Sequence, residues 1–159
     1  MDLIKNHKPA RIKRSTNLTK KTSAAKKIAA YQKFYKSDVS LIASAKAGIS
    51  SHAISDIMEI SGKTINEIAS LLYVTPRTIR NYQNENKSLP VLQSEQLLKL
   101  YSLYDRGIDV FGSTDAFTRW LSKPAFGLAS DTPNNLLLTS TGTKMVMDEL
   151  SRIQHGDFA

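Results

Sequence analysis

Apolar residues recur at spacings of three and four along most of the chain, which is the period of an amphipathic helix. Glycines at 48, 62 and 156 and a proline at 124 follow such segments, where they end helices. The pattern predicts an all-α fold, with helices over residues 23–36, from Asp38 to Gly48, from Ser50 or Ser51 to Gly62, from Thr64 to about Leu72, from Thr75 to about Asn84, and over residues 91–111.

Two helix starts in the middle of the chain have specific signals. Thr64 and Glu67 form a capping box, in which each side chain satisfies a free backbone N–H of the other residue. Thr75 followed by Pro76 supplies a cap and a first-turn proline. Two short helices separated by a tight turn are therefore expected over residues 64–84.

This pair of helices resembles the helix-turn-helix of Xre-type repressors. Ala69 is small enough to let the two helices approach, and Tyr73 stands at the turn position where glycine is usual. The positions expected to be buried are Ile68, Ala69, Leu72, Val74, Ile79 and Tyr82.

The outer face of the second helix is rich in hydrogen-bond donors and lacks acids. Arginine can pair with guanine, asparagine with adenine, and a helix N-terminus can hold a phosphate. We therefore expect DNA contacts from this helix, although an ordinary solvated helix face has the same composition. The candidate residues are Thr75, Arg77, Thr78, Arg80 and Asn81.

The N-terminal stretch is strongly basic. Residues 1–27 hold nine Lys or Arg residues and one acid, so they carry the whole formal net charge of +8. Residues 1–22 have too few apolar residues for a packed core and are interpreted as a basic arm, in which Lys13 and Arg14 are candidate DNA contacts. A solubilising tail is the alternative interpretation.

Residues 91–111 predict one long helix with a wide apolar stripe and a glycine, Gly107, within it. A wide stripe indicates contacts on more than one side, with both flanking groups of helices or with a second copy of the chain. We therefore expect two helical domains, at residues 23–90 and at residues 91–159. The long helix opens the second domain and joins it to the first.

Three short helices are expected after this linker, beginning at Ser113 or Thr114, at Thr132-Pro133, and at Ser140 or Thr141. Asp148 and Glu149 are interpreted as surface charges, because no nucleophile accompanies them. The residues expected in the structural core are Ala69 of the first domain with Trp120, Leu121, Leu137, Val146, Leu150 and Ile153.

The order of residues from Trp120-Leu121 through Pro124, Leu128, Thr132-Pro133, Leu136-Leu137, Thr141, Gly142, Val146, Leu150 and Arg152-Ile153 to Gly156 resembles the toxin-binding domain of the MbcA/ParS/Xre antitoxin family. The resemblance covers roughly residues 92–158. Ala129 and Ser130 stand where such proteins often carry two glycines. The expected architecture is an N-terminal Xre-like helix-turn-helix bundle joined by a long helix to a small helical toxin-binding domain.

The resemblance implies a partner, a small toxin with a RES domain, which is an ADP-ribosyltransferase-like enzyme that consumes or uses nicotinamide dinucleotide. It also implies repression of the chain's own operon through operator DNA, and a homodimer within a toxin–antitoxin hetero-oligomer. We expect the last helix and the tail to enter the toxin's dinucleotide pocket. The candidate residues are Lys144, Arg152, Gln154, His155, Gly156, Asp157 and Phe158.

Composition narrows the alternatives. The chain has no cysteine, and its three histidines are scattered, so no metal site and no cofactor are expected. No long apolar run or signal segment is present, so we expect a cytoplasmic protein without a membrane partner. No catalytic constellation appears, so the chain is not expected to be an enzyme. A stand-alone DNA-binding regulator, whose C-terminal helices serve only dimerisation, is the competing hypothesis.

Overall fold

The computed structural model describes the backbone of residues 13–156 and the side chains of residues 23–156. Within this range the chain forms helices and no strand, which confirms the predicted all-α class. In chain order the elements are α1 (Lys13–Tyr35), α2 (Asp38–Ala47), α3 (His52–Ser61), α4 (Ile65–Leu71), α5 (Pro76–Asn84), α6 (Val91–Phe111), α7 (Thr114–Leu121), the 3-10 turn η1 (Phe126–Leu128), α8 (Pro133–Leu136) and α9 (Ser140–His155).

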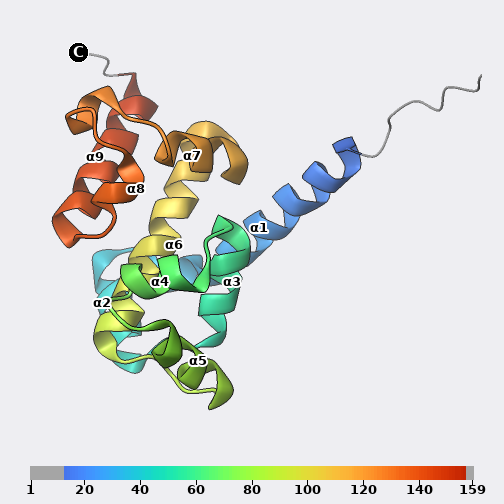
Figure 1. Cartoon of the computed structure of the whole chain (residues 1–159), viewed down its shortest axis with the longest axis vertical. Helices are drawn as coiled ribbons and strands as arrows, with labels where there is room; N and C mark the ends of the chain where they lie inside the picture. Colours follow the sequence, from blue (N-terminus) through green and yellow to red (C-terminus); the bar gives the residue numbers. More distant parts are fainter. Residues whose placement is uncertain (1–12, 157–159) are drawn as a thin grey trace, which may run out of the picture.

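Helix α6 is the axis on which the other helices pack (Figure 1). It contacts α1, α2 and α3 of the N-terminal part of the chain and α7 and α9 of the C-terminal part. The wide apolar stripe therefore serves contacts on several sides within one chain, as the sequence predicted. The buried positions of α6 include Leu97, Leu98, Leu100, Tyr101, Leu103 and Tyr104.

Helix α1 begins at Lys13, ten residues before the predicted start at residue 23. The apolar pattern marks only the part of a helix that packs, and residues 13–35 contain no glycine or proline that would stop the helix from extending beyond that part. Its packed part is held to α6 by the stacking of Tyr31 on Tyr101, with ring centroids 4.3 Å apart.

Capping residues set the helix ends, and two of the N-caps lie one residue before the predicted position. Ser37, and not Asp38, caps α2 by accepting a hydrogen bond from the backbone N–H of Ser40. Thr139 caps α9 in the same way for Gly142, one residue before the predicted start. Gly62 and Gly156 end their helices in the left-handed conformation, as predicted.

A polar contact supports the junction between the N-terminal helices and the C-terminal ones. Lys63, just before α4, donates from Nζ to the Oδ1 of Asn134 in α8 at 3.1 Å. Burial lowers the pKa of Lys63, and the nearby carboxylate of Glu67 partly offsets this effect. The amino group of Lys63 is thus held between the N-terminal helices and the C-terminal helices.

Candidate functional site

The turn between α4 and α5 is tightly closed. The predicted capping box is present at Thr64 and Glu67, and it lowers the pKa of Glu67 through hydrogen bonds from the backbone and hydroxyl of Thr64. The N–H of Val74 donates to the carbonyl of Ala69 at 3.0 Å. Tyr73 adopts a φ of 56°, the left-handed conformation usually given to glycine, so the turn keeps its shape with a non-glycine residue at that position.

Packing of α4 against α5 leaves one face of α5 in solvent. Ala69 and Ile79 are buried at the crossing of the two helices. Ile68 and Leu72 are also buried, whereas Val74 and Tyr82 are half-buried. The face of α5 opposite Ile79 is therefore presented outward.

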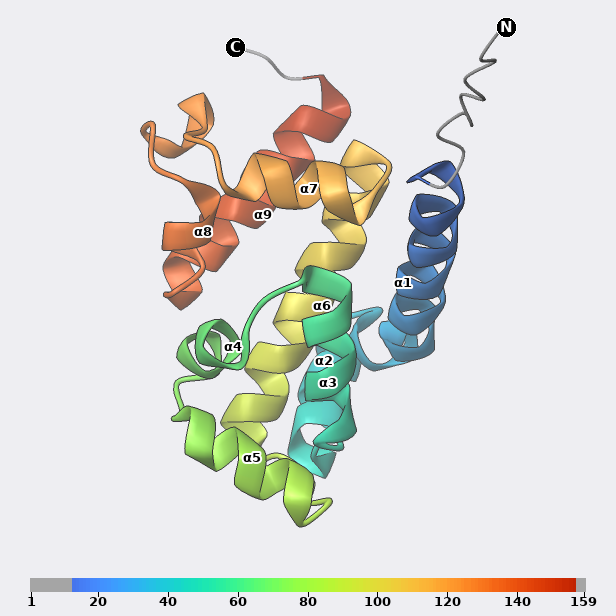
Figure 2. The same cartoon turned by 45° about the vertical axis from the view of Figure 1, so that its right-hand side comes forward.

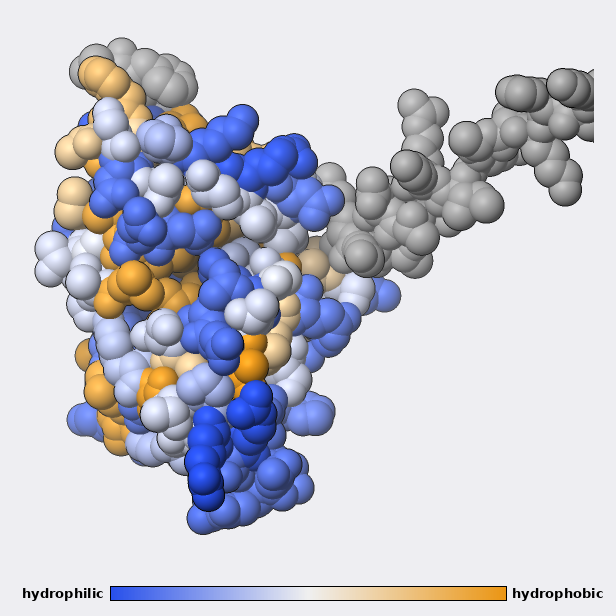
Figure 3. Space-filling model, viewed as in Figure 1, coloured by the Kyte–Doolittle hydropathy of each residue, from blue (hydrophilic) through white to orange (hydrophobic). Residues whose placement is uncertain are grey.

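The donors predicted to contact DNA lie on this outward face. Arg77, Arg80 and Asn81 are exposed, and none of them pairs with an acidic side chain among residues 23–156. Thr75 is the N-cap, and its hydroxyl oxygen accepts from the N–H of the half-buried Thr78 at 3.1 Å. The surface over α5, at the lower end of the molecule, is strongly hydrophilic (Figure 3).

Two further DNA candidates, Lys13 and Arg14, begin helix α1, but their side chains lie outside the described residues. Their backbone forms the first turn of this helix.

The C-terminal group of helices is organised around aromatic rings. The Phe117 ring lies directly on Gly107, where a side chain would meet it at 2.5 Å, so the glycine of α6 permits close approach of α7. Phe111 and Trp120 flank this ring, with centroids 6.1 and 5.9 Å from it. Trp120 is half-buried and therefore lies at the edge of the core.

The other predicted core residues lie between α7, α8 and α9. Ile153 is half-buried, whereas the remaining members are fully buried. The buried members of the C-terminal set are Leu121, Leu137, Val146 and Leu150.

The start of α9 lies directly against the end of α8. A side chain at Gly142 would collide with the carbonyl group of Leu136. Gly142 is buried, and its N–H is used by the Thr139 cap. The glycine therefore permits the close approach of these two helices. This is a physical reason for a glycine at position 142 in the series of residues from Trp120 to Gly156.

The loop before α8 has an unusual backbone. Ala129 and Ser130 have φ values of 53° and 61°, both left-handed. This is the conformation that a pair of glycines would adopt readily, at a lower steric cost. Positions 129 and 130 thus keep a glycine-type conformation without glycines. The 3-10 turn η1 just before them was not predicted.

The outer face of α9 carries charges that pair with one another. Lys144 pairs with Asp148 at 2.7 Å, and Arg152 pairs with Glu149 while donating to the carbonyl of Gly127 at 3.1 Å. The Glu149 side chain is only 13% exposed, so its interpretation as a surface charge was wrong. It is covered because the η1 loop folds over it, a contact distant in sequence.

The predicted toxin-binding residues do not all share one face. Lys144, Arg152 and His155 follow one another at spacings of eight and three, which places them on one side of α9, whereas Gln154 lies on the opposite side from Arg152. His155 Nδ1 donates to the carbonyl of Ser151 at 2.7 Å, and Gly156 is exposed at the helix end. Asp157 and Phe158 lie outside the described residues.

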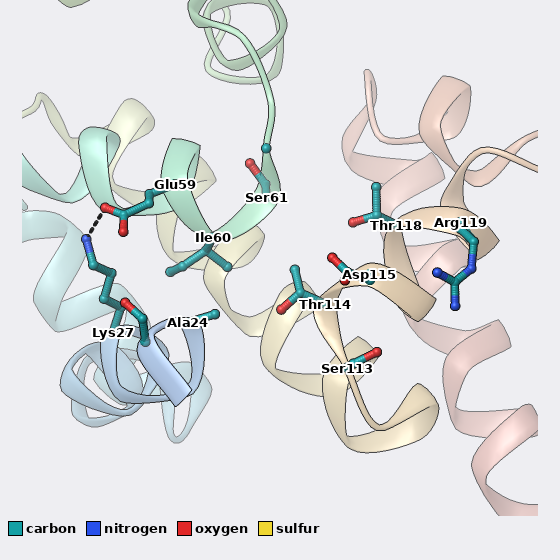
Figure 4. Close-up of a pocket in the computed structure, with 12 residues that line it drawn as sticks. Ala24, Lys27, Glu59, Ile60, Ser61, Ser113, Thr114, Asp115, Thr118 and Arg119 are labelled. Carbon is teal, nitrogen blue, oxygen red and sulfur yellow. Dashed lines mark hydrogen bonds and ion pairs between the residues drawn. The ribbon is translucent and has the colours of Figure 1, made fainter. Parts of the chain in front are cut away.

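A cleft of about 850 Å³ lies between α1, the end of α3 and the start of α7 (Figure 4). Cations Lys27 and Arg119 and acids Glu59 and Asp115 line it, so its charges are mixed. Lys27 donates to Asp56 at 2.7 Å and to Glu59 at 2.5 Å, and these bonds raise the pKa of Lys27 to about 12. None of the site residues predicted from sequence lines this cleft.

Within residues 13–156, no helix is long and apolar enough to cross a membrane. The same part of the chain holds no group of three or more His, Asp or Glu side chains arranged to bind a metal ion. The candidate surfaces are therefore the outward face of α5 and the outer face of α9, which lie toward opposite ends of the molecule (Figure 2).

Comparison with known proteins places the C-terminal helices in a described family. Residues 106–156 match the model of the antitoxin Xre/MbcA/ParS C-terminal toxin-binding domain. The chain is similar to an Antitoxin Xre of Yersinia enterocolitica, with 29% identity over 121 residues, which cover 75% of this chain and 81% of the relative.

Two other proteins named Antitoxin Xre match shorter stretches. The one from Photorhabdus laumondii is 32% identical over 65 residues, covering 40% of this chain and 44% of the relative. The one from Pseudomonas putida is 31% identical over 80 residues, covering 50% of each. The chain thus spans half or less of these two relatives.

These matches agree with one another, because all three relatives carry the name Antitoxin Xre and the matched domain is a toxin-binding domain. The chain is thus similar to antitoxins of the Xre/MbcA/ParS family, and residues 106–156 match the toxin-binding domain of that family.

Proposed function

We propose that this chain is an antitoxin that binds and sterically blocks a RES-domain toxin, an ADP-ribosyltransferase-like enzyme that consumes NAD, and that it represses its own operon by binding operator DNA. The observation that carries the first part is the match of residues 106–156 to a toxin-binding domain. The choice of a RES toxin rests on the family resemblance of the sequence. In this proposal the chain is not an enzyme.

The inhibitory segment is the end of α9 with the tail that follows it. Gly156 closes α9 by donating to the carbonyls of Arg152 and Ile153, so the residues after it leave a firmly ended helix. A carboxylate such as Asp157 and a ring such as Phe158 have the chemistry to occupy the toxin's dinucleotide pocket. Lys144, Arg152, Gln154 and His155 surround this exit or lie on the helix that leads to it.

Two truncations test this mechanism. Deleting Gln154–Ala159 removes the whole proposed segment, whereas deleting Asp157–Ala159 keeps Gly156 and the helix end. Both truncated chains should stay folded and lose inhibition of the toxin. Inhibition by either truncated chain equal to that of the full chain would show that the tail is dispensable.

Repression of the operon is assigned to α5. Its exposed donors Arg77, Arg80 and Asn81 and its capped N-terminus with Thr75 and Thr78 provide the chemistry for base and phosphate contacts in a major groove. The basic arm that includes Lys13 and Arg14 would add salt-dependent contacts to phosphates. In this proposal residues 23–90 form the DNA-binding domain and residues 91–159 form the toxin-binding domain.

A homodimer is supported by exposed apolar side chains on α2 and at the start of α6. Val39 and Ile42 are 77% and 51% exposed on α2, and Val91 and Leu92 at the start of α6 are also exposed. Apolar colour reaches the surface at the lower left of Figure 3, where Figure 1 places these segments. A dimer with two-fold symmetry would present two copies of α5 to two half-sites.

Co-expression with the adjacent open reading frame tests the function as a whole. A co-purifying toxin whose effect on growth is relieved by this chain is the expected result. Operator binding with no co-purifying protein and no toxicity would instead favour a stand-alone DNA-binding regulator.

A further inference from the structure

Phe126 is the most exposed large apolar residue in the described part of the chain. Its exposed fraction is 92%, whereas Ala125 and Leu128 on either side are buried at 8% and 2%. The ring contributes nothing to the core, yet the loop that carries it is firmly anchored. The loop projects from the C-terminal helices between α7 and α8 (Figure 2).

Hydrogen bonds within the loop hold the backbone around Phe126 in one shape. The N–H of Ala125 donates to the carbonyl of Asp131, and the carbonyl of Ala125 accepts from Leu128 and Ser130, at 3.0–3.2 Å. The side chain of Asp131 accepts from the N–H of Thr132 and from the amide of Asn135. A ring on such a loop loses little backbone freedom when a partner covers it.

Helix α9 supports the same loop from one side. Arg152 Nη2 donates to the carbonyl of Gly127, and any side chain at Gly127 would collide with Glu149 and Arg152. Met145, 41% exposed, lies four residues before Glu149 and therefore on the same face of α9. Phe126, Met145 and Arg152 thus border a single surface, hereafter the η1–α9 surface.

The charges that α9 contributes to the η1–α9 surface are paired with one another. Glu149 pairs with Arg152, and Lys144 pairs with Asp148. A partner that docks here meets an exposed aromatic ring and a methionine among compensated charges. Such a surface fits an apolar pocket of a folded protein better than a polyanion or a row of acidic side chains.

We propose that Phe126 is an anchor residue for the toxin, inserting its ring into an apolar pocket on the toxin surface, with Met145 and the Arg152 stem at its border. The proposal rests on the toxin-binding function of residues 106–156, within which the whole η1–α9 surface lies. It assigns toxin contact to the η1 loop in addition to the end of α9. Phe126 then governs affinity, and the tail governs blockage of the dinucleotide pocket.

The test is the affinity of the purified full chain for a catalytically inactive toxin, measured for Phe126→Ala and for a matched control, Leu138→Ala. Leu138 is 49% exposed in the same domain, but it precedes α9 at the end away from η1. Phe126→Ala should weaken binding by about tenfold to 100-fold, as expected of an aromatic hot spot. Leu138→Ala should change it by less than about twofold, and both variants should melt as the parent does.

Three outcomes separate the claims. Parent-like affinity of Phe126→Ala would overturn the anchor assignment while leaving the antitoxin function intact. Equal losses in Phe126→Ala and Leu138→Ala would also overturn it, because any exposed apolar residue would then serve. Failure of the parent chain itself to bind the toxin would refute the proposed function.

Discussion

Arginines lie on the outer faces of both α5 and α9, but those on α5 are unpaired within the described part of the chain and the one on α9 is paired with an acid. Arg77 and Arg80 contact no acidic side chain among residues 23–156, whereas Arg152 is paired with Glu149 and bound to the η1 loop. Uncompensated donors suit a polyanion, whose phosphates attract them without a tailored surface. Compensated charges around an exposed ring suit a protein partner with a complementary shape.

The same two regions also share a feature. Each has a tight turn in which residues other than glycine adopt positive φ, Tyr73 beside α5 and Ala129-Ser130 beside η1. Each such residue costs of order 1 kcal/mol, which the surrounding hydrogen bonds and packing must offset. Both candidate surfaces are thus held by turns that the rest of the fold imposes.

The largest expected effect is on the C-terminal region alone. Gly142→Ala places a methyl group against the carbonyl of Leu136 and should lower the free energy of unfolding by about 3 kcal/mol, despite the better helix propensity of alanine. Toxin binding should be lost, while operator affinity is retained. Urea denaturation followed by circular dichroism measures the change.

Thr141→Ala is the matched control for this substitution, because residue 141 is exposed in the same turn. Its free energy of unfolding should stay within about 0.5 kcal/mol of the parent value. A Gly142→Ala chain as stable as the control would contradict the close approach of α8 and α9.

The second effect concerns α5. Arg77→Ala combined with Arg80→Ala should weaken operator binding about 100-fold or more, because each arginine that contacts a base contributes about 1–3 kcal/mol. Toxin neutralisation should not change. Fluorescence anisotropy with operator DNA at fixed salt provides the measurement, and Arg119→Ala, an exposed arginine on α7, provides the control. If the α5 double variant and Arg119→Ala lost the same operator affinity, the arginines of α5 would contribute only non-specific attraction to DNA.

A smaller effect distinguishes the two regions by their response to acid. Burial opposes ionisation of Asp56, but hydrogen bonds from Lys27 and Tyr31 outweigh it and lower its pKa below the ordinary 3.8. Because the pKa is lower in the folded state, this stabilisation is present above pH 3.8 and is lost as the pH falls through the folded value. Asp56→Asn should therefore flatten the fall in stability between pH 5 and pH 2, as measured by urea unfolding at each pH.

Glu149→Gln is the comparison for acid sensitivity on the C-terminal side, since the Glu149 carboxylate pairs with Arg152 there. If Asp56→Asn and Glu149→Gln flatten the dependence of stability on pH equally, the loss of stability in acid is not specific to the N-terminal region.

The smallest effect is a gain. Ala129→Gly and Ser130→Gly should each raise the free energy of unfolding by about 0.5 kcal/mol, because relief of the left-handed conformation slightly exceeds the entropy that glycine adds to the unfolded chain. Thermal melting detects a shift of this size in the double variant. A loss of stability would mean that the side chains at these positions contribute packing that outweighs the backbone cost.

Local signals in the sequence predicted most of the helices correctly. The Thr64–Glu67 capping box, Thr75-Pro76, and the glycines at 62 and 156 each act within a few residues, so the sequence alone determines them. Helix α1 begins earlier than predicted because its first ten residues carry no apolar pattern and no helix-breaking residue.

Features that depend on distant contacts were not predictable in this way. Glu149 is covered because η1 folds over α9, and Phe126 is exposed because the loop turns Ala125 and Leu128 inward instead. In the sequence, Phe126 is one more aromatic residue and Glu149 one more charge. The sequence indicated which residues carry hydrogen-bond donors, whereas the fold determines which of these donors pair with an acidic side chain.

The most direct test of the central claim is a growth assay in cells that express the toxin encoded beside this chain, together with the parent antitoxin, the Arg77→Ala, Arg80→Ala variant, or Gly142→Ala. The account predicts that the parent and the α5 variant restore growth equally and that Gly142→Ala does not. Failure of the parent to restore growth, or failure of the α5 variant alone, would contradict a toxin-binding function that resides in the C-terminal helices.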